Sequence, residues 1–393
     1  MAIDLEHVYD RLYSYAQAAD FVGYDPFDGL NSRVFQATPL KNFRVARLAW
    51  LQMIKRSPVN LRGLLLVKPG VNPKGLTLFA LAELARYRTT GSAKHADNAA
   101  ELIERLMKLA IKGDGKDGPS LAFGYNFDWQ SRVFYAPKGT PAVVPTAFAF
   151  RALIESFEAT GNEDHRDAAA GICRFITSGL NRPVETTDEV CFSYTPVDRT
   201  GVYNASLLAA ECLARFGSVT ENTEYISLAA KAARFVIRRQ RGDGAWVYGE
   251  DKAQAWADNF HTAFILTSLS RISDNIPLVK AKADEAIKNG ISYWLDRFFL
   301  DDGTPKYYDC ETYPVDIHSA AAAIVAFSEL SELDERMQPL AERIVGWTTA
   351  NMLDAEGFFY YQKRKSRLVK TEFMRWGQAW MAYALARLIE SKA

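Results

Sequence analysis

Apolar and polar positions alternate with a helical period over most of this chain. In the segments 95–111, 165–180, 225–240 and 279–299, apolar residues recur at helical spacing and charged residues occupy the opposite face. Between these segments lie stretches rich in Ala, Ser and Thr, whose small side chains let helices approach closely. The pattern predicts amphipathic outer helices that alternate with more apolar inner helices.

The inner helices belong to a repeat of about 57 residues. Each begins after a short segment that combines aromatic and turn residues. The residues at five of these helix starts are spaced 58, 57, 57 and 58 apart, and they are Thr146, Asn204, His261, His318 and Trp376. A sixth helix start, at Leu76, precedes Thr146 by 70 residues, so this unit carries an insertion. We therefore predict an all-α fold, an α/α toroid of six helical hairpins.

The two ends of the chain favour a closed ring over an open superhelix. An open array of repeats ends in polar capping units, whereas the last helical segment, 377–389, is as apolar as the middle ones. No linker rich in Gly, Ser or Pro divides the chain, so we predict one domain over 1–393.

Charge and composition limit the function. The chain has 47 basic and 47 acidic residues, which argues against a general nucleic-acid binder. Its apolar runs are too short to span a bilayer, and the helix predicted at the start carries acids, unlike a secretory signal. The four Cys show no C-x-x-C spacing. These features predict a cytoplasmic protein.

A closed ring would bring the loops that precede the inner helices to one mouth. Two of these loops place an Asp shortly before a His, in "DNFH" and "DIH". An acid that orients an imidazole forms an acid–base pair, which makes Asp258, His261, Asp316 and His318 the candidate catalytic residues.

Aromatic and polar residues at the equivalent loop positions predict a sugar site. Flat rings stack on the apolar faces of sugars, and a few polar groups fix their orientation. Arg375 could hold the carboxylate of a uronic acid. The candidate substrate-binding residues are Trp129, Tyr194, Asn204, Trp246, Tyr248, Tyr313, Arg375, Trp376 and Gln378.

Structural interpretations of the same residues remain open. Asp258 and Asp316 are suited to cap the helices that follow them, and each His alone could be a hydrogen-bonded core residue. Trp246 and Trp376 could pack between helices. The segment "YDPFDGLNS", 24–32, has the residues of a turn and could also cover the mouth.

Two resemblances to known families bear on these alternatives. The segments "RRQRGDGAW" and "DNFHTAFILTSL" resemble the repeats of terpenoid-cyclase and prenyltransferase toroids. In the prenyltransferases a His at the position of His261 binds zinc. The chain lacks the acid motif of the cyclases and the Asp-x-Cys pair of the zinc site, so we predict no metal and no other cofactor.

"YDPFDGLNS", "YPVDIHSAAAAI" and "FMRWGQAWMAYAL" resemble bacterial and archaeal proteins encoded among surface-polysaccharide biosynthesis genes. That resemblance implies an α/α toroid that acts on or binds a glycan or its precursor, with partners in polysaccharide assembly.

Three functions follow as hypotheses. The first is an enzyme acting on a glycan or a uronate-containing saccharide, as an epimerase, a lyase or a hydrolase. The second is a non-catalytic glycan-binding or scaffold protein of polysaccharide assembly. The third is an isoprenoid cyclase or transferase, against which the missing acid motifs count.

Overall fold

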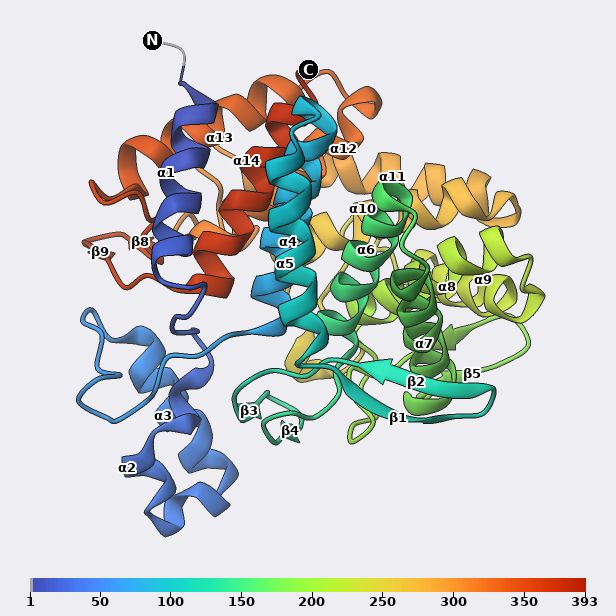
Figure 1. Cartoon of the computed structure of the whole chain (residues 1–393), viewed down its shortest axis with the longest axis horizontal. Helices are drawn as coiled ribbons and strands as arrows, with labels where there is room; N and C mark the ends of the chain where they lie inside the picture. The colour runs from blue at the N-terminus through green and yellow to red at the C-terminus, as the bar shows by residue number, and fades with distance from the viewer. Residues whose placement is uncertain (1–2) are drawn as a thin grey trace.

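The long helices alternate between an inner and an outer layer throughout residues 3–393, the part of the chain that the computed structural model describes (Figure 1). The inner helices are α4 (Pro73–Thr90), α6 (Val143–Thr160), α8 (Tyr203–Thr220), α10 (Asn259–Asn275), α12 (Ile317–Leu330) and α14 (Trp380–Glu390). The outer helices are α1 (Leu5–Ala18), α5 (Ala93–Met107), α7 (Glu163–Gly179), α9 (Thr223–Ile237), α11 (Pro277–Phe298) and α13 (Met337–Met352). A π-helical turn, Met374–Ala379, leads into α14.

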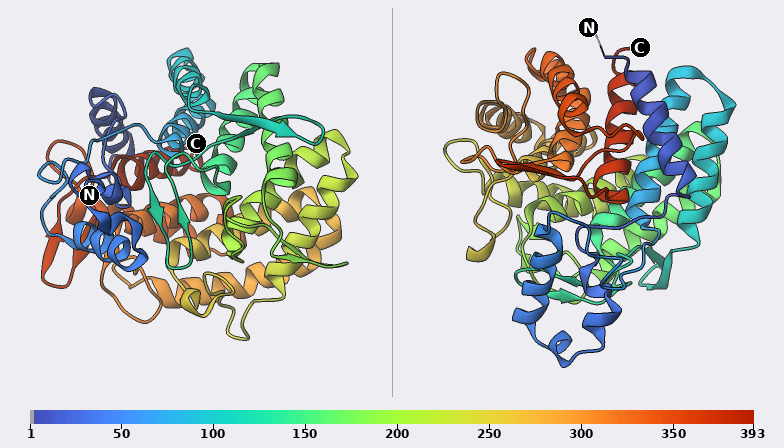
Figure 2. Two further views of the ribbon diagram at one scale, coloured as in Figure 1. Left: turned by 90° about the horizontal axis from the view of Figure 1, so that it is seen from below. Right: turned by 90° about the vertical axis from the view of Figure 1, so that its left-hand side faces the viewer.

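The inner helices form a closed ring. Each packs on the next, and α14 packs on α4 to complete the circle, which the left view of Figure 2 shows from below. Five hairpins join consecutive helices, whereas the sixth pairs α14 with α1 from the opposite ends of the chain. The predicted all-α toroid of six hairpins is confirmed. Closure removes the exposed apolar face that an open end would leave.

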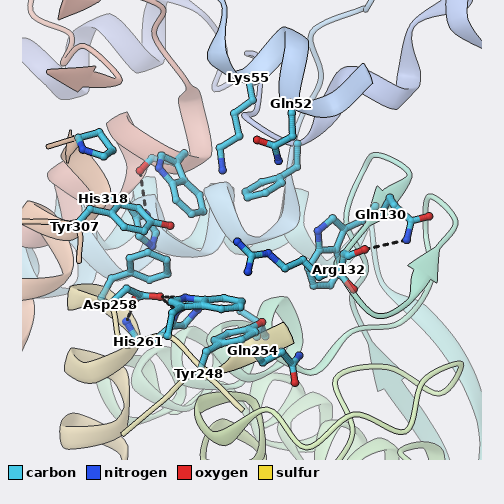
Figure 3. Close-up of a pocket in the computed structure, with 18 of the residues that line it drawn as sticks. Gln52, Lys55, Gln130, Arg132, Tyr248, Gln254, Asp258, His261, Tyr307 and His318 are labelled. Carbon is cyan, nitrogen blue, oxygen red and sulfur yellow. Dashed lines mark hydrogen bonds and ion pairs between the residues drawn. The ribbon is translucent and has the colours of Figure 1, made fainter. Parts of the chain in front are cut away.

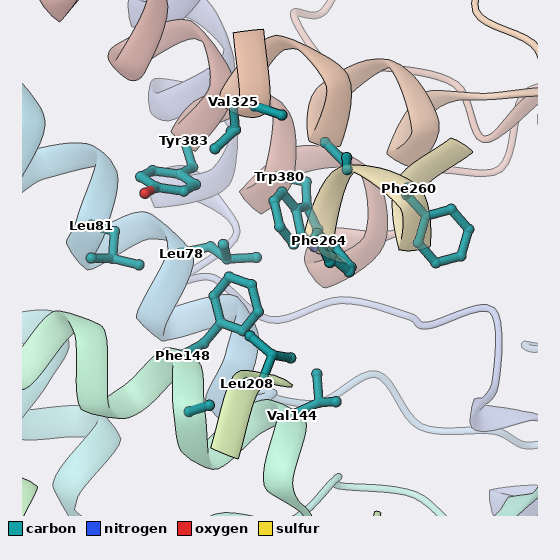
Figure 4. Close-up of a cluster of buried hydrophobic side chains, with 14 of the residues drawn as sticks. Leu78, Leu81, Val144, Phe148, Leu208, Phe260, Phe264, Val325, Trp380 and Tyr383 are labelled. Atoms are coloured by element: carbon teal, nitrogen blue, oxygen red, sulfur yellow. The ribbon is translucent and has the colours of Figure 1, made fainter. Parts of the chain in front are cut away.

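Apolar side chains from all six inner helices fill the centre of the ring (Figure 4). Leu78, Phe148, Leu208, Phe264, Val325 and Trp380 meet there and are buried. Elsewhere small residues bring neighbouring helices close, as in the buried run Ala320–Ala323 of α12. The alternation of large and small side chains allows close packing at the centre of the ring.

A ladder of backbone hydrogen bonds ties the loops of the ring together. The first N–H group of α6, α8, α10 and α12, and that of the π-helical turn before α14, donates to the carbonyl of a Tyr in the next loop around the ring, at 2.9–3.2 Å. These pairs are Val143 with Tyr194, Tyr203 with Tyr248, Asn259 with Tyr307, Ile317 with Tyr361, and Met374 with Tyr24. The series closes on Tyr24 of the segment 24–32. The helix α4 makes no such bond because it begins with Pro73, which has no N–H group.

Short strands lie in the loops at the mouth of the ring. They form two-stranded antiparallel sheets β1–β2, β3–β4 and β5–β6, and a three-stranded sheet β7–β8–β9. Their bounds are β1 Ile111–Gly115, β2 Gly118–Ala122, β3 Trp129–Gln130, β4 Tyr135–Ala136, β5 Val184–Glu185, β6 Val190–Cys191, β7 Val315–Asp316, β8 Gln362–Arg364 and β9 Arg367–Val369. The first two sheets account for the 70-residue interval between the inner helices α4 and α6.

An excursion between α1 and α4 lies outside the repeat. It contains the turns Asp28–Asn31 and Pro39–Asn42 and the helices α2 (Arg33–Gln36) and α3 (Arg44–Arg56). These elements project from the ring at the lower left of Figure 1 and have a small hydrophobic cluster of their own, Leu30, Phe35 and Leu51. No helix within residues 3–393 has the length and apolar character needed to cross a membrane.

Candidate active site

A cavity of about 860 Å³ opens where the inner helices begin. That volume is in the range of sites for small ligands. Its walls come from the loops before α6, α8, α10, α12 and α14 and from the excursion. Figure 3 shows Gln52 and Lys55 of α3 reaching into it from one side, opposite Tyr248 and His261.

His261 is held by the residue that caps its own helix. Asp258 accepts the His261 backbone N–H through Oδ1 at 3.0 Å, and its Oδ2 lies 2.7 Å from Nδ1 of the imidazole. Asp258 is therefore both a helix cap and the partner of the ring. Since the carboxylate occupies Nδ1, Nε2 is the nitrogen left for a ligand, and the side chain is 19% exposed.

His318 is held by a backbone carbonyl instead. Its Nδ1 lies 3.2 Å from the carbonyl oxygen of Trp376, which only accepts hydrogen bonds, so Nδ1 carries the proton and Nε2 a lone pair. The ring stacks on the Trp376 indole, with centroids 4.0 Å apart. Burial, followed by the nearby Lys74 and Arg375 cations, holds the pKa of His318 well below its usual value. His318 is therefore a neutral base.

The two imidazoles flank the same aromatic ring. The Phe260 centroid lies 4.1 Å from that of His261 and 4.8 Å from that of His318. Both histidines line the cavity, as the repeat predicts from their equivalent positions on α10 and α12. The structure thus places two imidazoles with free Nε2 atoms side by side at one end of the cavity.

Trp256 forms the aromatic wall next to His261. Its indole stacks on Tyr248 at 4.8 Å between centroids, and the Arg132 guanidinium lies 4.4 Å from its centroid. Its Nε1 donates to Asp258 Oδ2 at 2.9 Å, so the carboxylate that holds His261 is itself fixed. Tyr194 and Trp129 pack against each other elsewhere in the lining, at 4.8 Å.

Arg375 is paired with a carboxylate of the chain itself. Asp25 accepts from Nε at 2.6 Å and from Nη2 at 2.8 Å, and both side chains are almost fully buried. Asp25 belongs to the segment 24–32, whose Phe27 also lines the cavity and packs on Trp376. That segment therefore forms part of the wall. The role of Arg375 as a carboxylate clamp stays a prediction; the structure adds that Asp25 already compensates its charge.

Lys74 places an amine without an acidic partner at the floor of the cavity. It is buried in the first turn of α4, and its Nζ lies 4.2 Å from the Phe148 centroid and 4.9 Å from that of Trp380. No ion pair or hydrogen bond to this Nζ occurs within residues 3–393. Burial lowers the pKa of Lys74 well below its usual value, and Arg375 lowers it further. Asn204, also buried in the lining, has an Oδ1 without a partner in the described chain.

More cations than acids line the cavity. Lys55, Arg56, Arg132 and Arg364 surround the mouth, while Asp258 and Glu311 are the acids of the lining. Burial lowers the pKa of Lys55 to about 8. Among residues 3–393, no three His, Cys, Asp or Glu side chains are arranged to hold a metal ion.

Comparison with known proteins identifies the fold. No protein-family model matches the chain, and no curated protein matches it by sequence. Solved structures do match. A cellobiose 2-epimerase from Bacillus thermoamylovorans aligns with a TM-score of 0.63 at 15% identity, over 82% of this chain and 88% of that one. An unsaturated glucuronyl hydrolase specific for heparin aligns at 0.60 and 13% identity, over 99% and 96%. A D-mannose isomerase aligns at 0.58 and 13% identity, over 82% and 87%.

The fold is that of the sugar-processing α/α toroids. At these identities the likeness establishes the architecture, and function has to be argued from the site. The resemblance to surface-polysaccharide proteins stays a prediction, as do the cytoplasmic location and the assembly partners. None of the three matches is a terpenoid cyclase.

The structure brings most of the predicted site residues to the cavity. Those that line it are Trp129, Tyr194, Asn204, Tyr248, Asp258, His261, Tyr313, His318, Arg375 and Trp376. Tyr313 stands at the rim and is 36% exposed. Loops about 57 residues apart therefore do converge, because the ring closes.

Three predicted residues lie outside the lining. Trp246 is a core residue whose Nε1 donates to the Val236 carbonyl at 2.9 Å. Gln378 is fully buried and bonds the backbone N–H and carbonyl of Phe359, both at 2.8 Å. Asp316 is also fully buried; it caps α12 and accepts from Gln362 and Trp376. Asp316 thus supports Trp376 and does not touch the imidazole of His318.

Sequence reasoning missed Lys74, Trp256, Asp25 and Lys55. A signal existed for two of them. Lys74 is the only charged residue between Lys68 and Glu83, and it falls in the first turn of an inner helix. Trp256 lies two residues before the cap Asp258. The excursion, which supplies Lys55 and Asp25, has no counterpart in the repeat, so periodicity gave no register for it.

Proposed function

We propose that this chain is a carbohydrate-active enzyme that moves a proton at a sugar carbon next to a carbonyl, as an epimerase or an isomerase does. One observation carries the proposal. His261 and His318 present free Nε2 atoms to one end of a cavity that has aromatic walls and a cationic mouth.

This arrangement suits a reaction with two proton carriers. One imidazole removes the proton from the carbon next to the carbonyl, and the other returns a proton to the same carbon or to its neighbour. The negative charge that develops on the carbonyl oxygen needs a fixed hydrogen-bond donor. The Lys74 amine at the cavity floor is suited to that task because it can donate in either protonation state, and Trp256 and Tyr248 offer faces for a sugar ring.

Hydrolysis is supported less well. A glycosidase of the common type needs two carboxyl groups on either side of the bond that breaks. Asp198 and Asp316 do not line the cavity, and Asp258 already accepts bonds from His261 and Trp256. A lyase shares the proton abstraction with an epimerase, so it remains the nearest alternative.

The structural neighbours support a sugar as substrate, since the names of two of them are those of a sugar epimerase and a sugar isomerase. The excess of cations around the mouth favours a saccharide that carries an acid. Together with the resemblance to surface-polysaccharide proteins, this leads us to propose a uronate-containing glycan precursor as substrate, in the cytoplasm.

Deuterium exchange tests the reaction. The protein is incubated in D2O with a panel of reducing disaccharides, aldoses and free uronates, and proton NMR follows the loss of signal next to the carbonyl. We expect exchange with at least one sugar for the wild type and for the control His165→Gln, whose His lies on α7 outside the cavity. His261→Gln and His318→Gln should still bind that sugar by calorimetry but lose exchange.

Two outcomes would count against this reaction. If the wild type binds sugars and none exchanges deuterium, the chain is a glycan-binding protein. If exchange survives both His substitutions, other groups move the proton.

The positioning role of Asp258 gives a second test, with Asp258→Asn. Asn still caps α10, so the melting temperature should change by less than about 2 °C. The amide no longer fixes the tautomer of His261, and kcat should fall about 100-fold to 10,000-fold. The pH profile should move as well, which loss of a helix cap alone would not cause. An unchanged pH profile with unchanged kcat would show that Asp258 serves only as a cap.

A further inference from the structure

Most of the excursion between α1 and α4, from residue 29 onward, carries positive charge without any acid. Residues 29–72 contain eight Lys and Arg and no Asp or Glu, although the whole chain balances 47 basic against 47 acidic residues. The exposed members are Arg33, Lys41, Arg44, Arg56 and Lys68. The remainder of the chain therefore has an excess of acids, and the molecule is strongly polarised.

A second basic segment lies against the excursion. Residues 357–371, which include β8 and β9, contain five Lys and Arg and no acid. Arg364 and Arg367 of this hairpin donate to the backbone carbonyl of Arg56 at the end of α3, at 3.1 and 3.5 Å. We call the surface formed by residues 29–72 and 357–371 the basic face. The right view of Figure 2 looks toward this side of the molecule.

The exposed charges of the basic face are not neutralised by the protein. None of its exposed cations forms an ion pair within residues 3–393. These cations are Arg33, Lys41, Arg44, Arg56, Lys68, Lys365, Arg367 and Lys370. Elsewhere on the surface, Arg and Lys side chains commonly have an acidic partner, as Arg215 has in Glu158. The basic face therefore attracts anions from outside the chain.

Large apolar side chains stand among these cations. Of the 15 exposed large hydrophobic residues within residues 3–393, eight lie in the excursion. Val45 is 78% exposed, Leu64 79% and Phe43 61%. They lie outside the cavity, so a sugar bound there would not cover them. Soluble proteins rarely leave apolar residues gathered on one projecting element unless something binds there.

We propose that the basic face docks on the surface of a lipid bilayer that contains anionic lipids. Such a surface matches both the charges and the apolar side chains of the basic face. Its phosphate and carboxylate headgroups would face the cations, and the boundary of the acyl chains would accept Phe43, Val45 and Leu64. A soluble acidic protein or a nucleic acid would pair the charges and leave these apolar residues in water. The attachment that we propose is to the bilayer surface; no helix of residues 3–393 is suited to cross the bilayer.

Docking in this way places the cavity beside the membrane. Leu48 and Gln52 of α3 and Arg364 of β8 line the cavity, and the same two elements belong to the basic face. The mouth would open next to the bilayer surface. This inference does not depend on the reaction proposed above, because the exposed cations and apolar residues that carry it, Arg56 excepted, do not line the cavity.

Vesicle sedimentation tests the proposal. The full chain is mixed with vesicles of phosphatidylcholine alone or with about 30% phosphatidylserine. We expect binding to the anionic vesicles that weakens with added salt, and little binding to the neutral ones. A charge variant, Arg33→Glu/Lys68→Glu/Lys365→Glu, should lower the apparent affinity about 100-fold or more. An apolar variant, Phe43→Ser/Leu64→Ser, should lower it about tenfold or more.

Matched controls change the same chemistry elsewhere. Lys94→Glu/Lys116→Glu/Lys288→Glu reverses three exposed cations of the remaining surface, and Val219→Ser/Leu278→Ser removes two side chains that are each 78% exposed. Both controls should bind like the wild type, and circular dichroism checks that every variant folds.

The proposal is overturned if the wild type does not sediment with anionic vesicles, or if the controls lose as much binding as the variants of the basic face. It is also overturned if the chain binds soluble polyglutamate as tightly as anionic vesicles and Phe43→Ser/Leu64→Ser changes neither, because the surface would then recognise acidic polymers.

Discussion

The ion pair between Asp25 and Arg375 joins the excursion to the last inner helix, and its removal is a sharp test of the structure. We consider Asp25→Asn, which keeps the size of the side chain and an oxygen able to accept the Phe27 N–H. The substitution removes the charge that faces the Arg375 guanidinium at 2.6 and 2.8 Å. Both side chains are about 4% exposed, so water cannot replace the lost carboxylate.

The expected size of the effect follows from this burial. Breaking a buried ion pair on one side costs about 3–5 kcal/mol, because a desolvated charge stays behind without a partner. For a chain of 393 residues, with an unfolding entropy of about 2.1 cal/mol/K per residue, that loss lowers the melting temperature by about 4–6 °C. The double variant Asp25→Asn/Arg375→Met removes both charges, so it should melt higher than Asp25→Asn alone.

Differential scanning calorimetry of the wild type, Asp25→Asn, Arg375→Met and the double variant measures the coupling energy between the two side chains. The control is Asp243→Asn, which breaks the exposed ion pair with Arg241 and should change the melting temperature by less than about 1 °C. If Asp25→Asn behaves like this control, or if the two single effects simply add, the pair does not stabilise the fold and the closure of the ring through the segment 24–32 has been misjudged.

Two further predictions concern His318 and the core around Trp246. Because burial, then Lys74 and Arg375, keep the pKa of His318 low, the unfolded chain takes up a proton that the folded chain resists, and stability should fall as the pH drops below about 6.5. Urea titrations at about pH 7.5 and pH 5 measure how much unfolding free energy each protein loses over that range. The loss for His318→Gln should be smaller than the wild-type loss by up to about 2 kcal/mol. An equal loss in both proteins would mean that His318 is protonated when folded. Gly290→Ala places a methyl group 2.5 Å from the Trp246 ring. In the same titration it should destabilise the fold by about 1–3 kcal/mol, and sugar binding should stay unchanged. Weaker sugar binding would show that Trp246 belongs to the sugar site after all.

The ring of helices could be predicted because each helix is specified by residues that lie close together in the sequence. An amphipathic helix shows its buried face in the spacing of its apolar residues, and a 57-residue period shows that the unit recurs. The spacing from Thr146 to Trp376 located the inner helix starts, and the structure confirms that register. The excursion at 19–72 could not be placed, because short helices held by contacts such as Arg62 with Asp28 leave no period.

The candidate site was predictable in position but not in detail. A repeat position says that a residue lies near the mouth, while the direction of its side chain depends on what packs beside it. Trp246 and Trp256 illustrate this, since both come from one loop. Trp246 turns into the core against Gly290, and Trp256 turns toward the cavity, where Asp258 and Tyr248 hold it.

The sequence by itself determined the helices, their number of repeats and the positions of His261 and His318 at equivalent helix starts, because these depend on residues close together in the chain. Only the tertiary structure decided which groups carry free charge. Arg375, expected to hold a substrate carboxylate, is neutralised by Asp25 from the other end of the chain, while Lys74, which the repeat does not single out, has no ionic partner within residues 3–393. Charge compensation acts through space over a few ångströms, and a linear sequence does not record which distant residues the closed ring brings to that distance.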